Sequence, residues 1–178
     1  MAEQRKYTRT TKSAVKSKPV DEYGHLQPQA IDFEEAVLGA LMIEKDAYSI
    51  VSEILRPESF YDHKHQLLYR AIMTLAMRQQ PIDILTVAEQ LRSTGDLEEA
   101  GGPFYITQLS GKVASSAHIE YHARIIAQKF LARELITFTS NIQTKAFDET
   151  QDVDDLMQEA EGKLFEISQK NMKKDYTQ

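Results

Sequence analysis

The sequence predicts an all-α fold, in which a small globular helical domain is followed by a long antiparallel helical hairpin. Apolar residues recur three and four positions apart through most of the chain from residue 28 onward, which is the helical period. Strand-like alternation of apolar and polar residues is nowhere sustained. Proline, glycine and polar stretches interrupt the pattern at intervals that suit separate helices.

Composition is that of an ordinary globular protein. Of 178 residues, 42% are hydrophobic and 27% are charged, and a chain this long can bury about two-thirds of its unfolded surface. Cysteine is absent, which excludes disulfides and thiolate zinc sites and suits a reducing compartment. No apolar run approaches the roughly 18 residues of a membrane span. We therefore expect a cytoplasmic protein that does not contact a membrane.

The first 20 residues differ from the rest in charge. They hold six Lys/Arg and one Glu, a net of +5, so that residues 21–178 carry −11 of the chain's total of −6. Almost nothing in this segment could join a core, which is typical of disorder. We interpret residues 1–27 as a disordered basic N-terminal arm, either a solvated tail or a weak electrostatic contact to DNA. A transit peptide fits less well because no amphipathic stripe is present.

Two helices are expected first, over residues 28–44 and 46–55. Asp32 is a plausible N-cap of the first helix, and Pro57 should stop the second. The residues expected on the apolar faces of these two helices are Ile31, Ala36, Val37, Ala40, Leu41, Ala47, Ile50, Val51 and Ile54.

Three further helices follow, over residues 65–77, 83–94 and 103–109. Asp83 should cap the second of these and Gly95 should end it, while Gly101 and Gly102 form a turn before Pro103. The residues expected to face the core are Leu68, Ile72, Leu75, Phe104, Ile106 and Leu109.

Gly111 and Lys112 suggest a phosphate-binding loop, but the motif fails. A P-loop needs glycine five residues before its Gly-Lys pair and Ser or Thr after it. Ile106 and Val113 occupy those positions, and no strand precedes them. We therefore expect this chain neither to bind nor to hydrolyse ATP.

Histidines are the next candidates for chemistry. His118 and His122 lie one helical turn apart, but the zinc-protease motif needs Glu directly after the first His, where Ile119 stands. His63 and His65 are two residues apart and should fall on different faces of a helix. Without a third ligand we expect no metal site, and we interpret the histidines as partly exposed helix-surface residues. We identify no catalytic group, and a metal hydrolase remains a minor alternative.

The last third of the chain predicts a helical hairpin. One helix should run over residues 117–147, capped by Ser115 or Ser116, and a second should follow the polar turn at 148–152. The apolar stripes comprise Ile119, Ala123, Ile126, Phe130, Leu131, Leu135, Phe138 and Ile142 on the first helix, and Val153, Leu156, Ala160, Leu164 and Ile167 on the second. Apolar residues that lie off the stripes are Ile125, Ile136, Met157 and Phe165. A two-helix layer cannot cover this surplus, so we expect a second copy to cover it.

Five segments together resemble the N-terminal domain of the bacterial replicative DNA helicase, the DnaB family. They are residues 28–42, 57–72, 81–91, 95–110 and 117–126, and they occur in the order and spacing of that family. The resemblance covers about residues 28–170. It departs at His118, where the family usually has Asn, and at His122, where an aromatic residue such as Tyr is common.

The resemblance implies a function that periodicity alone does not. Members are hexameric, ATP-driven helicases of DNA replication, whose N-terminal domains pair through their hairpins into a collar of three dimers. Primase docks on that collar, and ATP and magnesium bind to a separate RecA-like motor domain. The chain is then a globular subdomain over 28–114, a dimerising hairpin over 115–170, and the start of a linker over 171–178.

Candidate site residues follow from combining the hairpin pattern with the resemblance. For packing within the hairpin and its dimer we expect Leu131, Leu135, Phe138, Ile142, Leu156 and Leu164. For primase docking we expect Tyr105, Ile136 and Ile142. Catalytic, cofactor-binding and metal-binding residues are not expected in this chain.

A free-standing helical DNA-binding protein is the alternative function. It would use residues 81–110 as a helix-turn-helix and the basic arm as an electrostatic contact. Residues 81–110 carry only Arg92 against five acidic residues, so they lack the positive face that DNA binding needs.

Deleting residues 1–27 should leave the folded part intact, because the segment has almost no core-forming residues. We expect the melting temperature, followed by circular dichroism, to change by no more than about 4 °C, which for a chain this long corresponds to roughly 1 kcal/mol. A larger drop would mean that the arm is docked on the folded domain.

Overall fold

The computed structural model describes residues 26–112 and 118–172. Its elements in chain order are α1 (Ile31–Leu41), α2 (Ala47–Ile54), the 3-10 helix η1 (Pro57–Ser59), α3 (His63–Met77), α4 (Ile84–Thr94), α5 (Gly102–Gly111), α6 (Ile119–Ala146) and α7 (Val153–Met172). Every element within these ranges is helical, which confirms the all-α prediction. Most of the expected arm, the Ser115 and Ser116 caps and most of the expected linker lie outside the described residues.

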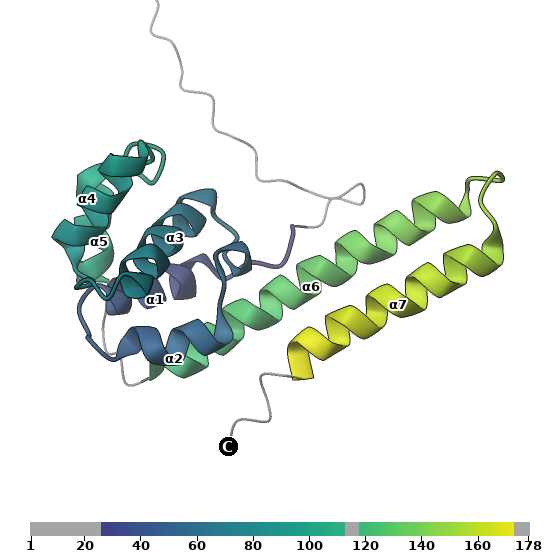
Figure 1. Cartoon of the computed structure of the whole chain (residues 1–178), viewed down its shortest axis with the longest axis horizontal. Helices are drawn as coiled ribbons and strands as arrows, with labels where there is room; N and C mark the ends of the chain where they lie inside the picture. The colour runs from purple at the N-terminus through teal and green to yellow at the C-terminus, as the bar shows by residue number, and fades with distance from the viewer. Residues whose placement is uncertain (1–25, 113–117, 173–178) are drawn as a thin grey trace, which may run out of the picture.

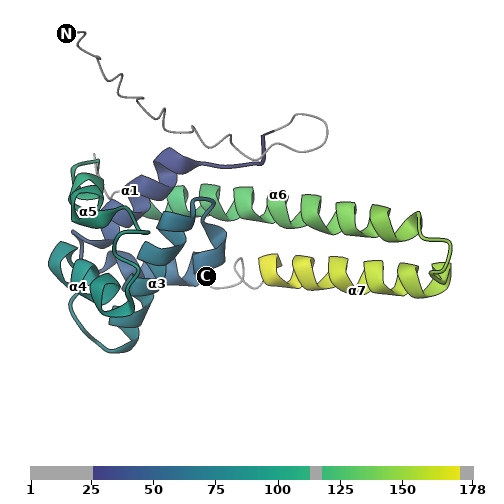
Figure 2. The same ribbon diagram turned by 90° about the horizontal axis from the view of Figure 1, so that it is seen from above.

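Helices α1 to α5 form a globule from which α6 and α7 project as an antiparallel hairpin (Figure 1). The view from above shows α7 running back beside α6 toward the globule (Figure 2). Ile119, Ala123 and Ile126 at the start of α6 belong to the same hydrophobic core as α1 to α5. The globule and the hairpin therefore share α6, and only its later turns are free of the core.

The core contains most of the residues that the helical period predicted. Leu68, Ile72 and Leu75 of α3 are buried, as are Ile106 and Leu109 of α5. Burying side chains of this size is worth about 1.5–3 kcal/mol each, which is why the apolar period predicts the core well.

Two residues expected in the core are exposed. Ile50 is 40% exposed because it lies at the edge of the face through which α2 packs by Ala47, Val51 and Ile54. Phe104 is 82% exposed. It lies two residues before Ile106, so the two side chains point to nearly opposite sides of α5 and only Ile106 reaches the core.

Helix ends agree in part with the sequence. Asp83 caps α4 by accepting hydrogen bonds from the backbone N–H groups of Leu85 and Thr86, each at 2.9 Å. Gly95 ends that helix in the left-handed conformation, with φ of 84°. Asp32, by contrast, is not a cap, because α1 starts after Ala30 and has no side-chain cap.

Two other boundaries also differ from expectation. Pro57 does not stop α2, which ends at Ile54 before an extended Leu55; Pro57 instead begins η1. The N-cap position of α6 is His118, whose own side chain makes no capping hydrogen bond. None of the helices in the described ranges combines the length and apolar character that a membrane crossing needs.

Asp83→Ala should lower the free energy of unfolding by about 1 kcal/mol, because it leaves two N–H groups of α4 without their acceptor. Urea unfolding of the whole chain measures this. Asp32→Ala is the matched control and should cost less, because Asp32 accepts no capping hydrogen bond. Equal losses in the two variants would contradict the capping assignment.

Candidate interaction surfaces

The free part of the hairpin exposes a row of large apolar side chains, which we call the hairpin apolar surface. Its members are Leu135, Ile136, Phe147, Val153, Met157, Leu164 and Phe165. Several large apolar side chains exposed on one pair of packed helices are typical of an interaction site. Two packed helices cannot cover it by themselves, so the exposed row is available to a partner.

The predicted packing residues of the hairpin divide into three groups. Leu156 is buried between α6 and α7, whereas Leu131, Phe138 and Ile142 are partly buried. Leu135 and Leu164 are exposed, the latter at 52%. Lys145 of α6 also holds α7 by an ion pair to Glu159, with Nζ 2.6 Å from Oε2.

The three predicted docking residues do not meet within one chain. Ile136 is exposed and Ile142 is partly buried, and both lie on the projecting part of α6. Tyr105 lies on α5 in the globule, at the opposite end of the molecule from the hairpin turn (Figures 1 and 2).

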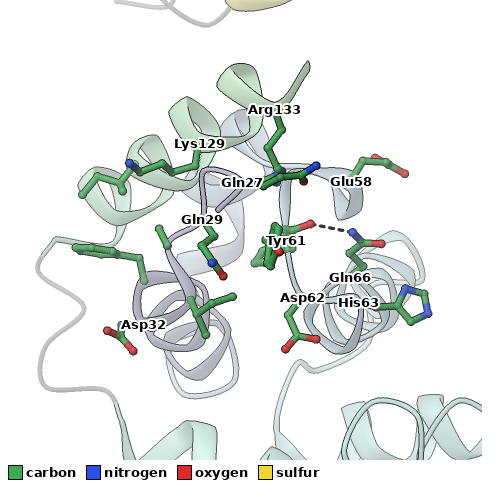
Figure 3. Close-up of a pocket in the computed structure, with 15 residues that line it drawn as sticks. Gln27, Gln29, Asp32, Glu58, Tyr61, Asp62, His63, Gln66, Lys129 and Arg133 are labelled. Atoms are coloured by element: carbon green, nitrogen blue, oxygen red, sulfur yellow. Dashed lines mark hydrogen bonds between the residues drawn. The ribbon is translucent and has the colours of Figure 1, made fainter. Parts of the chain in front are cut away.

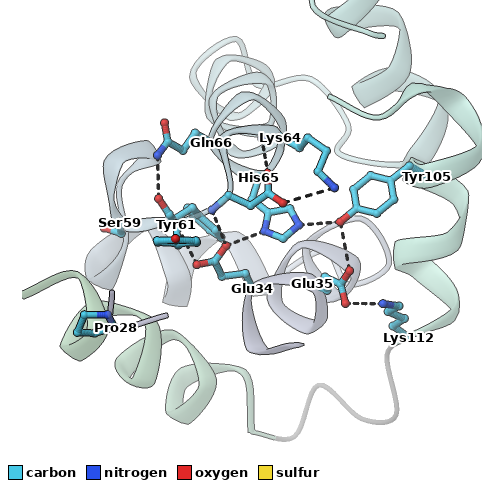
Figure 4. Close-up of polar contacts among 12 residues, drawn as sticks. Pro28, Glu34, Glu35, Ser59, Tyr61, Lys64, His65, Gln66, Tyr105 and Lys112 are labelled. Carbon is cyan, nitrogen blue, oxygen red and sulfur yellow. Dashed lines mark hydrogen bonds and ion pairs between the residues drawn. The ribbon is translucent and has the colours of Figure 1, made fainter. Parts of the chain in front are cut away.

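Tyr105 is held by a buried polar network that joins three helices (Figure 4). Its hydroxyl oxygen lies 2.7 Å from Nε2 of His65 on α3 and 3.2 Å from Oε1 of Glu35 on α1. Lys112, at the end of α5, forms an ion pair with the other oxygen of Glu35. The ammonium group of Lys64 lies 4.3 Å above the centre of the Tyr105 ring.

The inner end of the network is fully buried. Oε2 of Glu34, on α1, lies 2.6 Å from Nδ1 of His65, and both side chains are at most 1% exposed. Glu34 also accepts hydrogen bonds from the backbone N–H groups of Tyr61, at 2.7 Å, and Asp62, at 3.4 Å. One carboxylate therefore connects α1 both to the segment that starts α3 and to the His65 ring.

Burial raises the pKa of the Tyr105 hydroxyl, and the neighbouring charge of Glu35 raises it further. Gly101 makes room for the ring. It has a positive φ of 100°, and a Cβ built there would lie 2.7 Å from Cδ1 of Tyr105. A side chain at position 101 would therefore displace Tyr105 from the network.

The structure corrects our interpretation of the histidines. His65 is fully buried and hydrogen-bonded rather than a helix-surface residue. His63 is exposed and lies beside Glu99. The His122 ring is partly buried and makes a T-shaped contact with Phe33, with the two ring centroids 5.1 Å apart. Within the described ranges, no group of His, Asp and Glu is arranged to hold a metal ion.

Sequence reasoning missed Glu34 and Glu35 altogether. The available signal was their position between Phe33 and Val37, in a stretch of α1 that is otherwise almost wholly apolar. A carboxylate on a buried helix face needs hydrogen-bond partners. Those partners come from α3 and α5, which the local sequence of α1 does not reveal.

An open groove of about 1330 Å³ lies between the start of α1, the segment before α3, and α6 (Figure 3). Arg133 crosses its edge and donates hydrogen bonds to the carbonyl oxygens of Pro28 and Ser59, each at 2.8 Å. Burial lowers the pKa of this guanidinium, against the opposing charge of Glu34. The groove is lined by the acidic residues Asp32, Glu58 and Asp62 as well as by the basic residues Lys129 and Arg133. Arg133 serves to fasten α6 to the globule.

Helices α4 and α5 do not present a positive face. Arg92, the only basic residue between positions 81 and 110, forms an ion pair with Glu89 on the same helix. This arrangement gives no support to the helix-turn-helix alternative.

Comparison with known proteins identifies similar chains. A family model described as the DnaB-like helicase N terminal domain matches residues 26–128. The replicative DNA helicase DnaB of Rhodothermus marinus is 44% identical over 151 residues, which are 85% of this chain and 16% of the relative. The replicative DNA helicase DnaC of Bacillus subtilis is 39% identical over 145 residues, which are 82% of this chain and 32% of the relative.

Solved structures agree with these relatives. The N-terminal domain of DnaB helicase from Mycobacterium tuberculosis superposes with a TM-score of 0.74 at 35% identity, covering 78% of this chain and 98% of that one. A DnaB-like replicative helicase, solved to describe its interactions with primase, gives a TM-score of 0.64 at 28% identity over 78% of this chain and 31% of that one. The chain spans about a third or less of the length of the complete helicases it matches.

Tyr105→Phe should lower the free energy of unfolding by about 1–3 kcal/mol, because it removes the hydroxyl and leaves His65 and Glu35 each without one partner. Urea unfolding of the whole chain measures the loss. Tyr121→Phe on α6 is the matched control and should have little effect, since that side chain is 65% exposed. Similar small losses in both variants would show that the network does not stabilise the globule.

Proposed function

The chain belongs to the DnaB-like helicase N-terminal domain family, and on that basis we propose that it forms the collar of a replicative DNA helicase and docks primase there. The single observation that carries the proposal is the hairpin apolar surface on a domain of this family. An apolar row projecting from a complete globule is suited to binding other chains rather than to catalysis.

Self-association is proposed to occur through the hairpin. Two hairpins packed side by side make a four-helix arrangement, which would remove part of the hairpin apolar surface from water. Leu135 and Leu164 are the predicted packing residues with exposed surface left for a second copy, whereas Leu156 serves the contact between α6 and α7. In a complete helicase, three such dimers would form the collar of the hexamer.

Primase docking is proposed at Ile136 and Ile142 on the hairpin and at Tyr105 on the globule. The relative solved with its primase interactions supports primase as the class of partner. Because the hydroxyl of Tyr105 is bound inside the globule, its contribution would pass largely through the position of α5. A primase that contacts all three residues would have to engage both ends of the molecule or two copies of it.

The remaining assignments are also proposals. Residues 1–27 would be an arm with weak affinity for DNA, 28–114 the globule, 115–170 the hairpin, and 171–178 the start of a linker to a RecA-like motor. ATP and magnesium would bind that motor, with no cofactor in this chain, and the protein would act in the cytoplasm. The failed P-loop motif at Ile106 and Val113 supports the absence of a nucleotide site.

Light scattering at several protein concentrations, alone and with the C-terminal domain of the cognate primase, tests the proposal. The mass should rise from monomer to dimer with concentration, and a complex with primase should form. The proposal would be refuted if the chain stayed monomeric and did not bind primase at concentrations of about 100 μM. The Kd of either complex would then lie far above the micromolar range of specific assembly.

Ile136→Glu should weaken primase binding about thirtyfold or more, the cost of losing an interface anchor worth about 2 kcal/mol. Helical content and melting should stay nearly unchanged, because Ile136 is 40% exposed. Phe138→Ala should instead destabilise the hairpin and its dimer together, since this side chain is partly buried. Calorimetric titration and circular dichroism on both variants measure the two effects.

The two variants are controls for each other, because they lie two residues apart on one helix. Unfolding by Ile136→Glu, or primase binding at wild-type strength, would show that these faces of α6 are wrongly assigned.

A further inference from the structure

The network around His65 has more donor–acceptor contacts than there are protons to fill them when the histidine ring is neutral. Three contacts run in series from Glu34 to His65, from His65 to Tyr105, and from Tyr105 to Glu35, at 2.6, 2.7 and 3.2 Å. Ionised carboxylates at both ends can only accept hydrogen bonds. The three contacts therefore need three protons, and all of them must come from His65 and Tyr105.

Tyr105 supplies one of these protons. Burial and the nearby charge of Glu35 raise the pKa of its hydroxyl, so the group remains protonated and donates once. A neutral imidazole adds one proton, on Nδ1 or Nε2, which leaves one contact without a hydrogen. An imidazolium ion adds two, and every contact is then a hydrogen bond.

We propose that His65 is a proton-dependent clamp, which fastens α5 to both α1 and α3 only while both ring nitrogens carry protons. In that state Nδ1–H donates to Glu34, Nε2–H donates to the Tyr105 oxygen, and the Tyr105 hydroxyl donates to Glu35. When the ring is neutral, the buried Glu34 carboxylate, which can only accept, keeps the remaining proton on Nδ1, so Nε2 and Glu35 compete for the single proton of Tyr105. One of the two attachments of α5 is then lost.

The surroundings can accommodate the extra charge. The fully buried Glu34 carboxylate lies next to the ring and offsets the cost of taking the imidazolium out of water. The titratable and charged groups that face the network are Glu34 and Glu35 on α1, Asp62 and Lys64 at the start of α3, Tyr105 and Lys112 on and beside α5, and Arg133 on α6. The Lys112 ion pair balances Glu35, and Glu34, which also faces Arg133, is the carboxylate directly beside the ring.

The sign of the pH dependence follows from the hydrogen-bond count. Protonation completes the network in the folded chain, whereas an exposed ring in the unfolded chain gains no such contact. Folding therefore favours the protonated ring, and the stability should decrease as pH rises through the loss of that proton. The equilibrium constant for unfolding should rise about tenfold, the equivalent of one buried hydrogen bond.

The test is nitrogen NMR of the histidine rings in the full 178-residue chain, recorded as a function of pH. Both ring nitrogens of His65 should carry protons below the transition. Above it, one proton should be lost and the amide hydrogens of α5 should exchange faster. A ring that carries a single proton at every pH at which the chain is folded would overturn the proposal, and would assign the third proton to Glu34 or Glu35.

Stability measurements supply an independent readout. His63→Gln is the matched control, because His63 lies two residues away on α3, is exposed and pairs with Glu99. It should keep the pH dependence of the wild type. Tyr105→Phe removes the acceptor of Nε2–H and should flatten that dependence. An undiminished pH dependence in Tyr105→Phe would count against the clamp.

The consequence for binding rests on the proposed function, because Tyr105 is there a docking residue. Affinity for the C-terminal domain of primase should then fall with the same pH transition. If the ring titrates as expected while primase affinity stays constant, the clamp stands and the docking role of α5 fails. If primase does not bind at any pH, the proposed function fails without affecting the clamp.

Discussion

The globule depends on one carboxylate that has been taken out of water. Glu34 is almost fully buried, and its two oxygens accept from the backbone at the start of α3 and lie against the ring of His65. Removing a single partner from such a group leaves a buried charge, which costs several kcal/mol. The relative positions of α1, α3 and α5 are therefore coupled, since each supplies a partner that the others need.

The hairpin depends on the globule through α6. Its first turns contribute Ile119, Ala123 and Ile126 to the core, and Arg133 then donates to carbonyl oxygens of two separate segments of the globule. Among the residues that the structure describes, α6 packs beyond that point against α7, and large apolar side chains on the pair stay exposed. A rigid base carrying an incomplete two-helix layer is suited to building a symmetric assembly, because the missing surface can be supplied by another copy.

The two surfaces differ in how directly they can contact a partner. Side chains on the free hairpin, such as Ile136, can change without disturbing the core, because they rest on little else. Tyr105 cannot, since its hydroxyl is shared between His65 and Glu35. A substitution at Tyr105 therefore changes the globule as well as any interface, so a loss of binding there does not by itself identify a contact.

The sequence by itself determined the all-α class, the hairpin, the cap at Asp83 and the end of α4 at Gly95, because helical period, capping and chain reversal are local properties. It also carried the family resemblance, which rests on the order of five segments. Only the tertiary structure decided that Ile50 and Phe104 face solvent and that α6 belongs to both parts of the molecule. The same holds for Glu34, His65 and Tyr105, whose hydrogen-bond partners lie between 27 and 70 residues away. The physical reason is that a buried polar group is defined by what surrounds it, and those surroundings exist only after distant helices have packed.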